Sequence, residues 1–175
     1  SYQSHITYVS ATERFSGQSK IGADGVLQNY TAGRPFSDQQ IAAAAPKVAG
    51  FMVAWNQIHR WQHYGYATKE FTLAYISPTG GDIPAKPKEG LDGGGHVTRF
   101  LVQKYQRVYI SHLPMLADQG YRVQVTDSER LLFKDYIEFL EPFNVKGTKF
   151  IVERSIDPYE DDTVNSYLPT ERRVR

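Results

Sequence analysis

Large apolar residues recur at spacings of three and four between Pro46 and Gly65, which is the period of a helix with one apolar face. The apolar positions of this stripe are Val48, Phe51, Met52, Trp55, Ile58 and Trp61. A shorter helix-forming run at residues 41–45 follows the capping side chains of residues 37–40. The pattern therefore predicts two helices in one early block, with Pro46 in the first turn of the second and Gly65 at its end.

Much of the remaining chain alternates between apolar and polar residues, as strands do. The predicted strands are residues 71–76, 96–113, 121–126, 131–140, 164–168 and one beginning at Gly147, together with a hairpin within residues 15–30. In the second strand the apolar residues change parity between Val102 and Tyr105, which predicts a bulge or a break. Residues 78–95 contain three Pro, six Gly and five charged residues and predict a long mobile loop.

The order of these elements predicts a mainly β fold of the α+β class. Successive strands at short spacing, with the helices confined to one early block, favour an antiparallel sheet that carries helices on one side. The βαβ alternation of a nucleotide-binding sheet is missing. The length of 175 residues suits a single domain, and the 12 Tyr and 9 Phe are typical of half-buried sheet surfaces.

Composition and charge exclude several classes of protein. Twenty Lys and Arg against 19 Asp and Glu leave a net charge of +1, which argues against nucleic acid as a partner. No apolar run has the length of a transmembrane segment, and because residues 1–5 lack the features of a signal peptide, we expect the numbering to begin after any targeting segment. The absence of Cys excludes disulfides and thiolate chemistry.

The sequence contains little that indicates catalysis. His59 and His63 stand four residues apart on the predicted helix and so share a face on which a metal is conceivable, but Arg60 stands where the HExxH motif of zinc enzymes has Glu. Two surface or capping histidines are the simpler interpretation. No serine stands in a G-x-S-x-G turn, and the glycines at 93–95 precede a strand instead of a helix. We therefore predict no catalytic residues, no metal and no cofactor.

Four carboxylates lie within residues 157–162, a density that hard cations such as Ca²⁺ can use. The spacing and central Gly of an EF-hand are absent, so a solvated turn between two strands is the first interpretation, with a cation site or a docking patch as alternatives. The arginines at 172, 173 and 175 are candidates to pair with these carboxylates across a hairpin.

Several ordered segments resemble a proteobacterial family of unknown function, domain-of-unknown-function family 1329, whose members are commonly described as outer-membrane lipoprotein-sorting-like proteins. The resemblance begins at residues 29–36 (NYTAGRPF) and at residues 47–61 with their VAWN core, and it strengthens at residues 139–148 (FLEPFNVKGT). It continues through Asp157-Pro158, Asp161-Asp162 and residues 167–169 to the RRVR of residues 172–175. These segments cover most of residues 29–175.

The resemblance implies a periplasmic protein, peripheral to the outer membrane, with a fold similar to the lipoprotein carriers and acceptors. That fold is a curved antiparallel half-barrel whose concave face is covered by helices over an apolar cavity, and residues 1–175 would be the N-terminal part of a longer half-barrel domain. The implied function is a carrier or chaperone for lipid or another hydrophobic molecule. The implied partners are an inner-membrane transporter of the resistance-nodulation-division type and an outer-membrane β-barrel protein; no catalytic residues carry over.

An apolar cavity needs aromatic and aliphatic side chains on a sheet and on a covering helix. The sequence leaves open which strand face lines it, and ordinary core packing is the default interpretation of the helix stripe. The candidate ligand-binding residues are Phe51, Met52, Trp55, Ile58, Tyr105, Tyr109, Phe139 and Phe150. Two alternatives remain: a non-catalytic adaptor of a cell-envelope complex, docking a protein through residues 157–162 or 78–95, and, ranked last, a metal-dependent enzyme using His59 and His63.

Overall fold

A computed structural model of the protein describes residues 4–77, 96–170, 173 and 174. The contacts divide the chain into two compact units. The helical unit comprises Ser1–Gly65, Val108–Lys134 and Arg154–Asp162, and the sheet unit comprises Tyr66–Arg107, Asp135–Glu153 and Thr163–Arg175. The loop predicted at residues 78–95, and Arg172 and Arg175 of the arginine run, lie outside the described residues. The prediction of a single domain stays a prediction.

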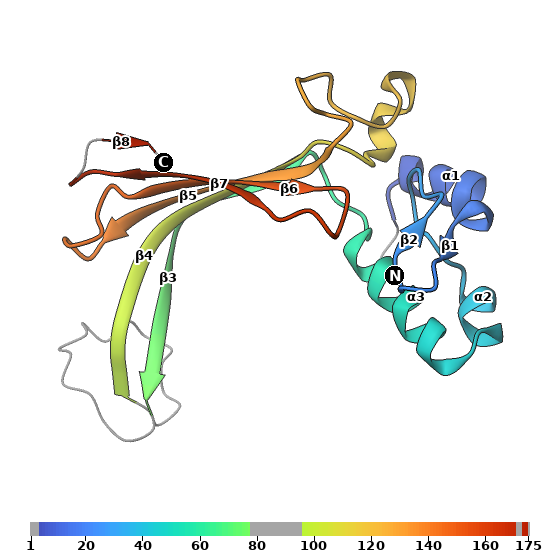
Figure 1. The fold of residues 1–175 in the computed structure, drawn as a ribbon, viewed down its shortest axis with the longest axis horizontal. Helices are drawn as coiled ribbons and strands as arrows, with labels where there is room; N and C mark the ends of the chain where they lie inside the picture. The colour runs from blue at the N-terminus through green and yellow to red at the C-terminus, as the bar shows by residue number, and fades with distance from the viewer. Residues whose placement is uncertain (1–3, 78–95, 171–172, 175) are drawn as a thin grey trace. The chain divides into compact units, whose positions relative to one another are not determined.

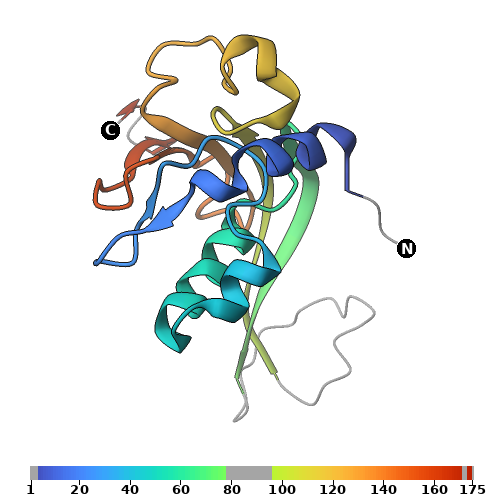
Figure 2. The same cartoon turned by 90° about the vertical axis from the view of Figure 1, so that its right-hand side faces the viewer.

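The helical unit contains three α-helices, two short 3-10 helices and a hairpin of two-residue strands (Figure 1). Its elements are α1 (Ile6–Phe15), η1 (Ser16–Gln18), β1 (Lys20–Ile21), β2 (Leu27–Gln28), α2 (Asp38–Ala43), α3 (Pro46–Ile58) and η2 (Pro114–Gln119). The hairpin predicted within residues 15–30 is confirmed, since β1 and β2 are antiparallel. α2 and α3 run side by side (Figure 2).

Local signals placed the start of α3 correctly, whereas α2 begins at Asp38, before the predicted run at residues 41–45, with Ser37 of the predicted capping side chains as its N-cap. The side chain of Ser37 accepts from the backbone N–H of Gln40, and the side chain of Gln40 accepts from the backbone N–H of Ser37, which is a complete capping box. Pro46 is the first residue of α3. However, α3 ends at Ile58, well before the predicted Gly65, because His59 leaves helical geometry as the C-cap.

The helix α1 was not predicted. Its sequence ITYVSATERF contains several β-branched residues, whose intrinsic helix propensity is low. Tertiary packing compensates, because Ala11 and Phe15, one turn apart, are buried with Ala32 in the core of this unit. The ring of Tyr121 meets that of Phe15 edge-on, with centroids 5.3 Å apart. Contacts distant in sequence therefore determine this helix.

The strand predicted at residues 121–126 is wrong, because this segment forms turns. Tyr121 has a φ of 64°, which an extended strand does not allow. Its backbone bonds instead close a loop: the N–H of Tyr121 donates to Leu116 O, and the N–H of Leu113 donates to Tyr121 O, both at 2.8 Å. Residues 121–123 are half-buried and residues 124–126 are exposed, so the alternation in the sequence does not correspond to two faces of a strand.

The large sheet has six strands in the order β3-β4-β5-β6-β7-β8. Their bounds are β3 (Gly65–Ser77), β4 (His96–Tyr109), β5 (Leu131–Glu141), β6 (Lys149–Ser155), β7 (Thr163–Leu168) and β8 (Arg173–Val174). β3 and β8 are the two edges, so the sheet is not closed, which is consistent with a half-barrel. Figure 1 shows β3 and β4 bending together along their length. The predicted mainly antiparallel α+β class is confirmed; that helices cover a concave face stays a prediction.

The change of parity predicted in the second strand is present in β4 without a break. Arg99 is exposed before it, and Gln106 and Val108 are exposed after it, so the exposed positions shift from odd to even numbers. Between them Leu101 and Val102 are buried on opposite faces of one continuous strand. Tyr105 and Arg107 both follow this change of parity, so they share one face of β4, while Gln106 and Val108 lie on the other.

No helix in the described part of the chain is long and apolar enough to cross a membrane.

Candidate functional site

The strands of the sheet unit present two chemically different faces. On one face Arg107 of β4 lies opposite Asp135 of β5, since its Nε and Nη2 donate to the two carboxylate oxygens, each at 2.7 Å. Side chains alternate between the faces of a strand, so Tyr105, Ile137 and Phe139 belong to this face as well.

β6, β7 and β3 extend the same face. The ring of Phe150 meets the ring of Phe139 edge-on, with centroids 6.0 Å apart. Val152 follows two residues later and pairs in register with Val164 of β7. At the other side of β4, the rings of Tyr66 and Tyr105 lie 5.6 Å apart. We call this set the apolar face: Tyr66, Tyr105, Ile137, Phe139, Phe150, Val152 and Val164, with the Arg107–Asp135 pair among them.

The opposite face of the same strands is charged. Glu138 of β5 lies 3.7 Å from the Nζ of Lys104 and 3.9 Å from the Nζ of Lys149, one lysine on each neighbouring strand. The hydroxyl of Tyr136 donates to Glu138 at 3.0 Å. Ile151 also belongs to this face and is 44% exposed. The two faces of one sheet therefore differ in the chemistry of what they can contact.

The apolar face is only partly covered. Tyr66 and Val164, at its two sides, are 48% and 51% exposed, and the other apolar members are half-buried. Among the described residues of the sheet unit, the buried ones are Leu101, Val102, Gln103 and Asp135. The face thus retains apolar surface that a bound molecule can remove from water.

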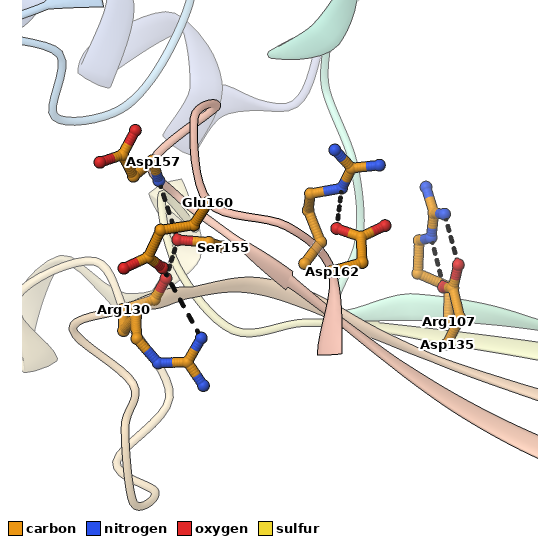
Figure 3. A network of polar contacts seen from close by, with 8 residues as sticks. Arg107, Arg130, Asp135, Ser155, Asp157, Glu160 and Asp162 are labelled. Atoms are coloured by element: carbon orange, nitrogen blue, oxygen red, sulfur yellow. Dashed lines mark hydrogen bonds and ion pairs between the residues drawn. The ribbon is translucent and has the colours of Figure 1, made fainter. Parts of the chain in front are cut away.

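The Arg107–Asp135 pair is the polar centre of the apolar face (Figure 3). Asp135 is only 8% exposed, although it stands in phase with the apolar Phe133 and Ile137. Burial, together with the hydrogen bonds of the Tyr105 hydroxyl to Tyr66 and Asp135, raises the pKa of Tyr105. Sequence analysis missed this pair; a carboxylate in phase with the apolar residues of a strand was the available signal.

The eight predicted ligand-binding residues fall into both units. Tyr105, Phe139 and Phe150 lie together on the apolar face, as the prediction of a shared binding surface requires. The remaining five belong to the helical unit: Phe51, Met52, Trp55, Ile58 and Tyr109. Of these, Ile58 is 48% exposed, whereas the ring of Tyr109 meets that of Phe133 edge-on. Ligand binding by all eight stays a prediction.

Trp55 lines a small cavity of about 160 Å³ within the helical unit. Three of the polar groups around it are bonded to backbone carbonyls: Trp55 Nε1 to Gly25 O at 2.9 Å, the Tyr30 hydroxyl to Gly33 O at 2.8 Å, and His112 Nδ1 to Thr31 O at 2.8 Å. The ring of His59 lies 4.1 Å from that of Tyr30 and 5.5 Å from that of His112. The cavity is therefore lined by rings that contact one another, and we call Tyr30, Trp55, His59 and His112 the imidazole cluster.

His59 and His63 do not share a helix face, because α3 ends before both of them. His59 is the C-cap and packs in the imidazole cluster, whereas His63 is exposed. The geometric basis for a metal site at this pair is therefore absent. The described residues hold no group of three or more His, Cys, Asp or Glu side chains that is suitable for a metal ion.

The buried histidines make stability depend on pH. Burial, with a smaller contribution from His112, lowers the pKa of His59 from 6.5 to about 3, and burial also lowers the pKa of His112. The unfolded chain therefore takes up protons first as the pH falls, so the free energy of unfolding decreases below about pH 6.5. We expect His59 alone to remove about 2 kcal/mol between pH 7 and pH 5 in urea titrations.

The matched variants for this pH dependence are His59→Phe and His63→Asn. We expect His59→Phe to flatten the loss of stability between pH 7 and pH 5, because the group that titrates on unfolding is gone. His63→Asn, at the exposed histidine, should leave the slope as it is. Equal slopes in the two variants would show that His59 does not titrate with unfolding.

The acidic stretch of residues 157–162 is a partnered turn (Figure 3). Asp162 lies 2.9 Å from Arg154 Nε, and Glu160 lies 3.8 Å from a guanidinium nitrogen of Arg130. The carboxylate of Asp157 accepts from the N–H of Tyr159 at 2.9 Å, in the manner of an Asx-turn. The counter-charges come from Arg130 and Arg154, while the predicted partners at residues 172 and 175 lie outside the described residues.

Comparison with known proteins gives one positive result. The chain matches over residues 3–175 the model of a family described as "Protein of unknown function (DUF1329)". No curated protein and no solved structure matches the chain. The match agrees with the resemblance seen in the sequence.

Proposed function

The chain belongs to the DUF1329 family, and on that premise we propose that it is a carrier or chaperone that binds lipid or another hydrophobic molecule on the apolar face of its sheet. The observation that carries the proposal is the contrast between the two faces of strands β4–β7. One face presents partly exposed aromatic and aliphatic side chains, whereas the other presents Lys104, Glu138 and Lys149. Partly exposed apolar side chains that gather on one face of a sheet are typical of a surface that binds another molecule.

The physics of a carrier fits this surface. Removing apolar area from water stabilises a complex by about 25 cal/mol per Å², so a ligand chain lying across several strands gains affinity from each side chain it covers. An open sheet also allows release, because one side of the ligand stays accessible. Periplasmic location and the transporter and β-barrel partners, which the resemblance implies, are part of the proposal and await their own tests.

A pair of charge substitutions on neighbouring strands tests the proposal. Val164→Asp places a carboxylate on the apolar face, and Ile151→Asp places one on the charged face at similar exposure. We expect the wild-type protein and Ile151→Asp to extract a fluorescent phosphatidylethanolamine from vesicles equally. Val164→Asp should extract it about tenfold less well, because ligand binding would desolvate the new charge.

Both substituted positions are exposed, so both variants are expected to fold, which circular dichroism checks. Equal losses in the two variants, or no extraction by the wild-type protein, would contradict binding at the apolar face. Absence of lipid together with a stable protein partner would favour the adaptor alternative instead.

A further inference from the structure

The helical unit has a second cavity, of about 370 Å³, that opens at its surface. We call it the arginine pocket. Its lining residues come from three segments that are far apart in sequence: Ser4, Tyr8, Arg34, Asn56, Arg60 and Trp61. The volume falls in the range of small-molecule sites in proteins.

The walls of the arginine pocket are held by specific contacts. The backbone N–H of Arg34 donates to the Thr12 hydroxyl of α1 at 2.8 Å. Trp61 stacks on His5 with centroids 4.7 Å apart, and the ring of Tyr8 meets Trp61 edge-on at 6.1 Å. The pocket therefore has an aromatic wall beside its two arginines, and these contacts join α1 to Arg34 and to the segment that follows α3.

The polar side chains that line the pocket are mainly hydrogen-bond donors, and its two charged residues, Arg34 and Arg60, are both positive. The amide of Asn56 is fully engaged, since its Oδ1 accepts from Phe36 N at 2.9 Å and its Nδ2 donates to Phe36 O at 2.8 Å. The Tyr8 hydroxyl donates to His59 O at 3.0 Å. No carboxylate occurs among the described residues that line the pocket, which include two arginines.

The existing partners of the two arginines leave positive charge in the pocket. Arg34 forms an ion pair with Asp38, whose side chain is 87% exposed, so solvent weakens that pair. Nη1 of Arg60 donates to the carbonyl of Gln57 at 3.0 Å, which is a hydrogen bond without charge neutralisation. An anion would stabilise two positive charges that line one cavity and have, among the described residues, a single exposed carboxylate, paired with Arg34, as a charged partner.

We propose that the arginine pocket binds the phosphate group of a phosphate monoester, independently of the lipid-binding function proposed above. Two planar guanidinium groups offer paired N–H donors to three phosphate oxygens and neutralise a charge close to two. A lone carboxylate needs only one arginine for the same geometry. The cavity is larger than a phosphate group, so the organic part of the ester has room beside Tyr8 and Trp61.

The test uses the whole chain and two soluble probes, inorganic phosphate and glycerol 3-phosphate, at constant ionic strength. Trp61 lines the pocket, so its fluorescence reports occupancy. We expect a saturable change with a dissociation constant below about 1 mM for glycerol 3-phosphate. Sodium chloride at the same ionic strength should give none.

Three exposed substitutions locate the site. Arg60→Gln should weaken glycerol 3-phosphate binding at least about tenfold, because it removes one of the two guanidinium groups. Lys20→Gln, which changes the net charge equally at an exposed position outside the pocket, should leave affinity within about twofold. Asp38→Asn should tighten binding, because it releases Arg34 from its carboxylate.

A phosphate monoester can come from solution or from a lipid headgroup, and vesicles distinguish the two. Saturable binding of glycerol 3-phosphate supports the soluble source, whereas binding only to vesicles containing phosphatidic acid, lost in Arg60→Gln, supports the headgroup. Equal weakening by Arg60→Gln and Lys20→Gln would show non-specific charge attraction and overturn the proposal. So would the absence of saturation with every probe.

Discussion

Replacement of Gly33 by alanine is expected to destabilise the protein by at least about 3 kcal/mol. Gly33 has a φ of 85°, which residues with a Cβ rarely adopt. A Cβ at this position would lie 2.5 Å from Thr12 N and 2.8 Å from Ala11 C, both in the backbone of α1. Because backbone cannot rotate away as a side chain can, α1 would have to move off the segment that leads into Arg34.

The surroundings of Gly33 leave little room for that movement. The Gly33 carbonyl accepts from the Tyr30 hydroxyl at 2.8 Å, and the next N–H, of Arg34, donates to Thr12 of α1 at 2.8 Å. Ala11, beside Thr12, is buried in the core of the helical unit. Displacing α1 would therefore disturb hydrogen bonds and core packing together.

Urea unfolding followed by circular dichroism measures this effect. Gly17→Ala is the matched control, since a Cβ there meets nothing within 4 Å and its φ is ordinary. We expect Gly17→Ala to change the free energy of unfolding by less than about 1 kcal/mol in either direction. A Gly33→Ala protein as stable as Gly17→Ala would mean that the approach of residues 29–36 to α1 is not as close as described.

Asp135→Leu is expected to cost roughly 3 kcal/mol, because it leaves the Arg107 guanidinium on an apolar face without its carboxylate. The side chains of Arg107 and Asp135 are 21% and 10% exposed, so water replaces the lost partner poorly. The hydrogen bond of the Tyr105 hydroxyl to Asp135 would be lost as well. The denaturation midpoint in urea reports the sum of these losses.

The double variant Arg107→Met with Asp135→Leu separates the pair from its surroundings. Removing both charges replaces an ion pair by apolar side chains of similar size, so we expect most of the loss in Asp135→Leu to be recovered. We expect this recovery because Asp135→Leu leaves the positive charge of Arg107 without the Asp135 carboxylate, whereas the double variant has neither charge. A double variant less stable than Asp135→Leu would show that the pair stabilises the sheet by more than its own desolvation costs.

Local signals in the sequence were sufficient to predict those helices and strands that nearby residues determine. The capping side chains of residues 37–40 and the position of Pro46 indicated two helices, and the alternation in residues 131–140 indicated β5. These signals act within a few residues, through caps, fixed φ and period-two patterning, so no knowledge of partners is needed.

Elements stabilised by distant contacts were missed or misplaced. α1 has weak intrinsic propensity and depends on Ala32 and Tyr121, and the segment at residues 121–126 alternates like a strand but is closed by bonds to residues 110–116. The end of α3 at Ile58, instead of Gly65, likewise depends on tertiary contacts, because the Tyr8 hydroxyl binds the carbonyl of His59. The periodicity of apolar residues along the chain does not show which distant residues will contact an element.

The sequence by itself determined the class of fold and the family of this protein. It also placed Tyr105, Phe139 and Phe150 on strands, because alternation decides which residues share a strand face. Only the tertiary structure decided which strand faces coincide, since strand pairing brings Arg107 opposite Asp135 and Val152 opposite Val164. The arginine pocket has the same origin, because side chains distant in sequence meet through packing that no local pattern encodes.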